Sequence, residues 1–137
     1  MTHNITSVFT GGMAFTSTLN GHDVSIDLDA SDGGNDAAPR PKALMLVSLA
    51  GCTGVDVVMI LNKMRVSFSE FSIEVKAQLT DTEPKIYHAV KIIYNIKVNN
   101  QDELKVEKAV DLSQNKYCGV SAMFRSFCEL SSQIVYK

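Results

Sequence analysis

Apolar and polar residues alternate along two long stretches of the chain, and this period of two predicts β-strands. Residues 71–79 alternate strictly, and residues 86–98 repeat the pattern. The second stretch places five apolar side chains on one side: Val90, Ile92, Tyr94, Ile96 and Val98. Because the residues between the apolar positions of 71–79 are polar, we expect two strands within residues 68–98, in a sheet with one face toward solvent.

The start of the chain shows a weaker alternation, broken by turn residues. Three short segments of this kind fall within residues 1–28, and the pairs Gly11-Gly12 and Asn20-Gly21 separate them. Such pairs are typical of tight turns between antiparallel strands. Residues 29–41 are rich in Asp, Ser, Gly, Asn and Pro, which predicts a loop.

A long helix is predicted over residues 42–65. Its first half is apolar on nearly all sides, so the helix should be buried on most of them. Pro41 suits a first helical turn, and the basic residues near Arg65 suit the C-terminal end of a helix dipole. A segment this apolar is difficult for one small sheet to cover, which predicts a second copy of the chain against it.

The last part of the chain has helical and then strand character. We expect helices within residues 101–127, interrupted at 113–116, and a last strand at 129–136. The complete order is β-β-β-α-β-β-α-α-β. This order predicts an α+β fold with an antiparallel sheet, in a single domain over residues 1–137.

Composition and charge exclude several classes of protein. The chain has 137 residues and a net charge of −2, without the basic patch that a nucleic-acid partner needs or the polybasic run that an anionic membrane attracts. The N-terminus lacks the features of a signal peptide, and the uncharged run at 43–55 is too short to span a bilayer. We therefore expect a cytoplasmic protein with no membrane partner.

The cysteines and histidines do not form a recognisable metal or disulfide pattern. Three cysteines without close pairs do not form a disulfide framework, and the three histidines lack metal-ligand spacing. No glycine loop typical of phosphate binding is present. From these spacings we expect no metal site and no bound cofactor.

The first cysteine, Cys52, lies within the predicted helix beside Gly51 and Gly54. It is either an inert buried side chain or a reactive thiol in a cleft. Each glycine costs a helix interior about 1 kcal/mol, which favours a close approach by another element. Asp56 lies one turn later on the same helix face, and its charge would raise the pKa of the thiol.

The second cysteine, Cys118, falls at the predicted start of a helix. Backbone N–H groups there favour a thiolate, and Lys116 adds positive charge nearby. A structural role is the alternative. Cys128 falls at the other end of that helix, and we interpret it as structural.

Two segments resemble the OsmC/Ohr family, and more closely its OsmC-like (YhfA-like) branch: AGCTGVDVV at 50–58 and AVDLSQNKYCGVSAM at 109–123. The likeness covers nearly the whole chain. It implies an intertwined homodimer in which antiparallel sheets wrap around central helices. It also implies organic hydroperoxide reduction, with Cys52 as the peroxidatic cysteine, Cys118 as the resolving cysteine and a dithiol as the reductant.

The chain departs from the peroxidases of that family around the reactive thiol. An arginine from the N-terminal strands and a glutamate at the start of the long helix accompany the thiol in those proteins. Here residues 1–39 contain no arginine, and Lys42 and Ala43 occupy the glutamate position. Candidate substitutes are Arg40, Lys42 or a residue of a second subunit, with Asp56 as a further supporting residue.

Three functional hypotheses follow. The first is a two-cysteine hydroperoxide reductase connected with oxidative stress. The second is a non-peroxidase protein of the same fold, which binds a small ligand or senses redox state at the dimer cleft. The third is a dimeric scaffold whose cysteines only pack.

Overall fold

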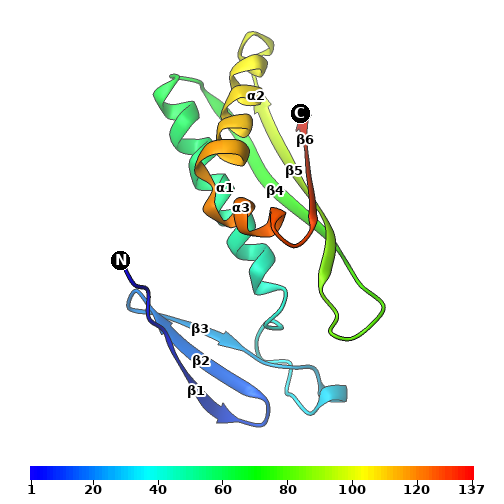
Figure 1. Ribbon diagram of the computed structural model, residues 1–137. Helices are drawn as coiled ribbons and strands as arrows, with labels where there is room; N and C mark the ends of the chain where they lie inside the picture. The colour runs from blue at the N-terminus through cyan, green and yellow to red at the C-terminus, as the bar shows by residue number, and fades with distance from the viewer. The chain divides into compact units, whose positions relative to one another are not determined.

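The N-terminal part of the chain is a small sheet with almost no core of its own. A computed structural model describes all residues 1–137 and divides them into two compact units, residues 1–46 and 47–137. The first unit contains β1 (Thr6–Gly11), β2 (Ala14–Leu19) and β3 (His22–Ile26), paired antiparallel in that order (Figure 1). No hydrophobic residue before Leu49 is buried.

The predicted turn between the second and third strands is confirmed. Leu19 pairs with His22, and both Asn20 (φ 53°) and Gly21 (φ 78°) adopt the positive φ that a two-residue hairpin turn requires. The loop that follows is held by Asp27, which is 1% exposed. Its carboxylate accepts hydrogen bonds from the backbone N–H groups of Leu28 (2.8 Å) and Ala37 (3.1 Å), which lower its pKa.

The second unit is one sheet covered by helices. Its strands are β4 (Phe68–Leu79), β5 (Tyr87–Val98) and β6 (Glu129–Tyr136), with β5 in the middle. Three helices lie over one face of this sheet (Figure 1): α1 (Leu44–Lys63), whose first turn belongs to the first unit, α2 (Glu103–Leu112) and α3 (Gly119–Arg125). A five-residue π-helical turn at Ser113–Tyr117 joins α2 to α3.

The α+β class is confirmed, but one strand pairing differs from the expected antiparallel sheet. Strand β4 is antiparallel to β5, whereas β6 is parallel to it and begins with Glu129 opposite Ala89. The reason is the helical connection between them. After β5 the chain returns through α2, the π-helical turn and α3 to the end where β5 began, and such a crossover produces a parallel neighbour.

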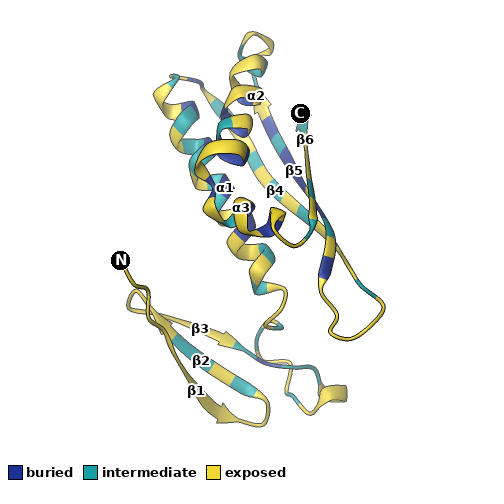
Figure 2. Ribbon diagram, viewed as in Figure 1, coloured by how far each residue is buried: buried dark blue, intermediate teal, exposed yellow.

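The hydrophobic core lies between this sheet and the helices (Figure 2). Four of the five β5 side chains predicted to share one side are buried: Val90, Ile92, Tyr94 and Ile96. Helix α1 contributes one buried residue per turn: Leu49, Thr53, Val57 and Leu61. A Cβ atom on Gly54 would lie 3.1 Å from Cδ1 of Ile73, so this glycine permits the close contact of α1 with β4. Gly51 has no such neighbour within 4 Å.

Helix α1 extends beyond the uncharged run at residues 43–55, and it also carries apolar side chains outside its buried face. Its 20 residues, with a mean hydropathy of 2.2 over 18 of them, are long and apolar enough by length and composition to cross a membrane. The core helix of a soluble protein meets the same criterion. Large apolar side chains stay exposed on it in the single chain: Met45, Val47, Val55 and Met59. Helix α1 therefore packs one face within its own chain and leaves apolar side chains uncovered on others.

Replacement of Leu61 by alanine should lower the free energy of unfolding by about 2–5 kcal/mol, because the side chain is fully buried and its removal leaves a cavity. Urea denaturation followed by circular dichroism measures the change. Leu104→Ala is the matched control, since Leu104 is 76% exposed and its truncation should change stability by less than about 0.5 kcal/mol. Equal losses in the two variants would contradict this assignment of the core.

Candidate functional site

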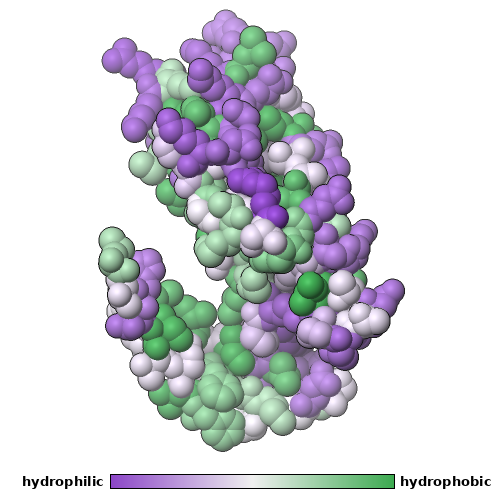
Figure 3. All heavy atoms as spheres, viewed as in Figure 1, coloured by the Kyte–Doolittle hydropathy of each residue, from purple (hydrophilic) through white to green (hydrophobic).

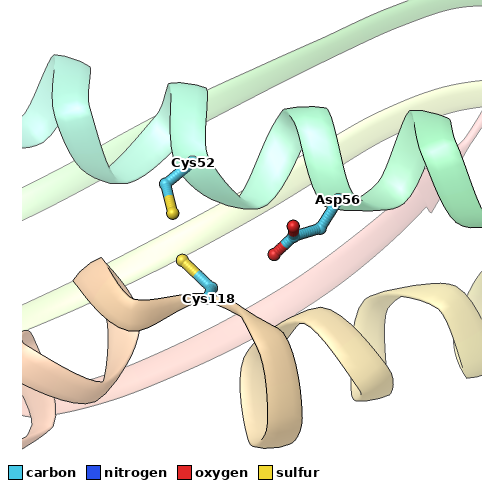
Figure 4. A group of neighbouring side chains, drawn as sticks. All are labelled: Cys52, Asp56 and Cys118. Carbon is cyan, nitrogen blue, oxygen red and sulfur yellow. The ribbon is translucent and has the colours of Figure 1, made fainter. Parts of the chain in front are cut away.

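Two cysteines and one carboxylate meet between α1 and the start of α3. The Sγ atoms of Cys52 and Cys118 and a carboxylate oxygen of Asp56 all lie within 4.8 Å of one another. Cys52 and Asp56 are four residues apart on α1 and therefore point from the same face toward Cys118 (Figure 4). The fold thus joins two thiols that are 66 residues apart in the sequence.

Cys118 is placed by the end of the π-helical turn. Its N–H donates to the carbonyl oxygen of Ser113 at 2.8 Å, and its backbone then becomes extended (φ −76°, ψ 100°). Cys118 is the N-cap of α3, and its Sγ accepts a hydrogen bond from the N–H of Ser121 at 3.3 Å. The predicted position at a helix start is confirmed, and the side chain is 3% exposed.

Cys52 is only partly buried, and its surroundings mostly oppose a thiolate. Burial raises the pKa of the Cys52 thiol, and a hydrogen bond and charge from Cys118 and the charge of Asp56 raise it further. The N–H of Val120, in the first turn of α3, acts in the opposite direction. The sequence-based expectation that Asp56 raises this pKa is confirmed in direction.

Asp56 has a hydrogen-bond partner that the sequence did not reveal. The hydroxyl of Ser113 donates to its Oδ2 at 3.0 Å. Ser113 Oγ also lies 2.7 Å from Thr53 Oγ1, which lies 2.7 Å from the hydroxyl of Tyr94. Gln114 Nε2 donates to Tyr94 at 2.8 Å. These buried side chains connect α1, β5 and the π-helical turn, and every buried side-chain N or O atom of the chain has a partner.

The direction of these hydrogen bonds follows from Asp56. Ser113 donates its one hydroxyl hydrogen to Asp56 Oδ2. Ser113 must then accept from Thr53, and Thr53 must in turn accept from Tyr94. The network therefore directs its donors toward Asp56, which fixes the position of the carboxylate beside the two sulfurs.

A cavity of about 500 Å³ begins at Asp56. The other residues of its wall are mostly apolar: Met59, Ile60, Lys63, Met64, Leu112 and Tyr117. The cavity therefore provides an apolar approach to the carboxylate of the thiol cluster, with one lysine on its wall.

The other predicted site residues are outside this cluster. Arg40 belongs to the first unit, where its Nη1 donates to Asp36 Oδ1 at 2.8 Å and to the carbonyl oxygen of Ala38 at 3.1 Å. Lys42 is exposed and forms none of the salt bridges of the chain. Cys128 is a free thiol between α3 and β6 and is not part of the cluster.

Sequence reasoning missed the residues that support the cluster. Ser113 and Gln114 were assigned to a break between helices, and Tyr94 to a strand face. A polar signal was present, because Thr53, Ser113, Gln114 and Ser121 occur in the two segments that carry the cysteines. Their burial depends on the π-helical turn, which turns both Ser113 and Gln114 inward and has no clear sequence signature.

A family model and a curated relative both match this chain over most of its length. The family model described as OsmC-like protein matches residues 33–132. Protein YhfA from Escherichia coli (strain K12) is 27% identical over 106 residues, which cover 77% of this chain and 76% of that protein.

Solved structures are similar over the whole chain. A hypothetical protein from Aquifex aeolicus VF5 has a TM-score of 0.80 and 27% identity, covering 100% of this chain and 98% of its own. An organic hydroperoxide resistance protein from Elizabethkingia anophelis has a TM-score of 0.72 and 16% identity. The match covers 100% of this chain and 97% of that protein's chain. The second likeness is one of fold alone.

The alkylation rate of Cys52 by iodoacetamide should rise with pH, with a midpoint above the value of an ordinary cysteine, about 8.5. Asp56→Asn should lower that midpoint, because it removes the negative charge and keeps an oxygen that can accept from Ser113. Mass spectrometry of the digested protein measures each cysteine separately. The midpoint of Cys128 should not change, and an unchanged midpoint for Cys52 would contradict the electrostatic role of Asp56.

Proposed function

The chain belongs to the OsmC-like protein family, in its YhfA-like branch, and we propose that it is a thiol-dependent reductase of organic hydroperoxides. The family and its hydroperoxide-resistance neighbours support a redox role connected with peroxides. The observation that carries the proposal is the close approach of Cys52 and Cys118, whose sulfurs lie within 4.8 Å of each other.

The proposed reaction uses the two thiols in turn. The Cys52 thiolate attacks one peroxide oxygen and the O–O bond breaks, so that Cys52 becomes a sulfenic acid and the leaving alkoxide takes a proton to form an alcohol. The Cys118 thiol then attacks the Cys52 sulfur, which releases water and forms a disulfide. An external dithiol reduces this disulfide by thiol–disulfide exchange. One hydroperoxide thus consumes two thiols and yields one alcohol and one water molecule.

Asp56 is proposed to orient the two thiols in this reaction. It lies beside both sulfurs, and Ser113 holds it there. Its charge raises the pKa of the Cys52 thiol, so its proposed part is to accept hydrogen bonds from the thiols rather than to stabilise a thiolate. The N–H of Val120 supports the anion. Arg40 and Lys42 remain candidate supports for the thiolate.

The cavity beside Asp56 favours an apolar substrate. Its wall is mostly Met, Ile, Leu and Tyr side chains, which would bury an organic group better than they would retain hydrogen peroxide. The proposed cycle also requires thiols that a cellular dithiol can regenerate. A reducing compartment meets this need, and we therefore propose a cytoplasmic location.

Cumene hydroperoxide should remove two of the three free thiols of the reduced protein and produce a Cys52–Cys118 disulfide, detected by thiol titration and non-reducing mass spectrometry. Cys52→Ser should keep its thiols. Cys118→Ser should stop at a sulfenic acid that dimedone labels. Cys128→Ser is the matched control and should react as the unmodified chain does.

Persistence of all three thiols, or equal oxidation of Cys52→Ser, would contradict the peroxidase proposal. The alternative is a non-peroxidase protein of the same fold that binds a ligand or senses redox state at this site. The raised pKa of Cys52 favours that alternative, because a protonated thiol reacts slowly with peroxides.

We further propose that residues 1–137 act as one OsmC-like domain within a homodimer, as is typical of this family. The three-stranded sheet of the first unit has no buried hydrophobic residue, and such a sheet is not stable alone. Apolar side chains occur at the surface of both units (Figure 3). In the first unit they include Val8, Phe9, Phe15 and Val24, and on α1 they include Val47 and Val55.

Light scattering should give a particle of twice the 15.0 kDa chain mass. Val55→Glu should shift the protein toward the monomer, because it places a charge on the exposed apolar surface of α1. Leu104→Glu changes a residue that is also exposed, on α2, and should leave the particle mass unaltered. A monomer in the unmodified protein would remove the dimer proposal.

A further inference from the structure

The donor set of the thiol cluster is suited to a metal ion. Two sulfurs and one carboxylate oxygen lie within 4.8 Å of one another. With Zn–S bonds of about 2.3 Å, two sulfurs on one tetrahedral zinc ion are separated by about 3.8 Å, and a carboxylate oxygen lies nearer still. Side-chain adjustments of about 1 Å would therefore bring all three donors to bonding distance. We propose that Cys52, Asp56 and Cys118 bind one Zn²⁺ ion and leave a fourth coordination position open.

A hydrogen-bond donor outside the cluster already lies beside each proposed ligand. The hydroxyl of Ser113 donates to Asp56, and the N–H of Ser121 donates to the Cys118 sulfur. The N–H of Val120 favours the anion of Cys52. Such outer donors orient ligands and are a regular part of protein metal sites.

The charge of the cluster also favours a cation. With both thiols ionised, the three ligands carry three negative charges, and no lysine or arginine within residues 47–137 forms a salt bridge with Asp56. Binding of Zn²⁺ displaces the two thiol protons into solvent and reduces the charge from three negative to one.

The ligand types select zinc over other common ions. Magnesium and calcium require oxygen ligands, of which the cluster offers one side chain. Copper(I) is satisfied by two thiolates and would not need the carboxylate. Two thiolates with one carboxylate suit zinc, which accepts sulfur and oxygen together and commonly has three protein ligands at open sites. Asp56 also lines a cavity of about 500 Å³, which therefore reaches one of the three proposed ligands.

The sequence indicated no such site because its ligands do not form a local pattern. Cys52 and Asp56 are one helical turn apart, but Cys118 joins them only through the fold. The site does not depend on peroxide reduction. A zinc ion would occupy the same sulfurs and prevent their oxidation, so zinc binding and disulfide formation exclude each other.

The test is an anaerobic titration of the reduced, chelator-treated full chain with Zn²⁺ against a chromophoric chelator. The expected result is one ion per chain, with about two protons released into a weakly buffered solution. Cobalt(II) in place of zinc should show the absorption of a tetrahedral site with thiolate ligands. Cys52→Ser and Cys118→Ser should abolish this spectrum, and serine can still act as the N-cap of α3 in the second variant.

Two further variants test the carboxylate. Asp56→Asn should weaken zinc binding at least about tenfold, and Ser113→Ala should weaken it about 10- to 100-fold by loosening Asp56. Cys128→Ser is the control and should bind as the unmodified chain does. Circular dichroism verifies that each variant is folded.

Three results would overturn the proposal: no binding to the reduced chain, unchanged binding in Cys52→Ser, or unchanged binding in Asp56→Asn. The last would mean a two-thiolate site without the carboxylate. Because no peroxide is used, these results are independent of whether the chain reduces hydroperoxides.

Discussion

The buried hydrogen bonds around Thr53 determine the arrangement of the site. Thr53 lies on the core face of α1, where its hydroxyl contacts Tyr94 of β5 and Ser113 of the π-helical turn. Buried hydroxyls are costly without partners, so these three elements must keep one relative position. Cys52 lies next to Thr53 in sequence, and Cys118 lies five residues after Ser113. The interaction that satisfies the core therefore also sets the distance between the two thiols.

The same network ends in a conflict of charges. It directs its donors to the carboxylate of Asp56, which lies beside two thiols that would function as anions. A nearby arginine would resolve this conflict by favouring the thiolate, but the only arginine before residue 65 is Arg40, which pairs with Asp36 in the first unit. The N–H of Val120 provides the one resolved influence that lowers the pKa of Cys52. The site is thus arranged for proximity of the thiols more than for their ionisation.

Sequence patterns predicted the elements of this fold more completely than their contacts. The alternation in residues 86–98 placed Tyr94 in a buried row, and the apolar segment before Arg65 predicted a long helix, because both depend on the local period of side chains. The parallel pairing of β6 depends instead on where the returning helices end. The partner of Asp56 depends on a π-helical turn that was predicted only as a break. The pairing of Cys52 with Cys118 was inferred from the family resemblance and not from their spacing.

Proximity without strong ionisation has a chemical consequence. A Cys52 thiol whose pKa is raised reacts slowly with an oxidant, whereas the proposed Zn²⁺ ion would displace the protons of both thiols, and Asp56 adds attraction for that cation. The charge of Asp56 thus works against the first step of the proposed peroxide reduction and in favour of the proposed metal binding. Under the two proposals, the reaction that prevails depends on the relative supply of hydroperoxide and zinc, because a metal-bound sulfur cannot attack a peroxide and a disulfide cannot bind a metal. Asp56, a charged residue in an apolar helix, would then set this balance.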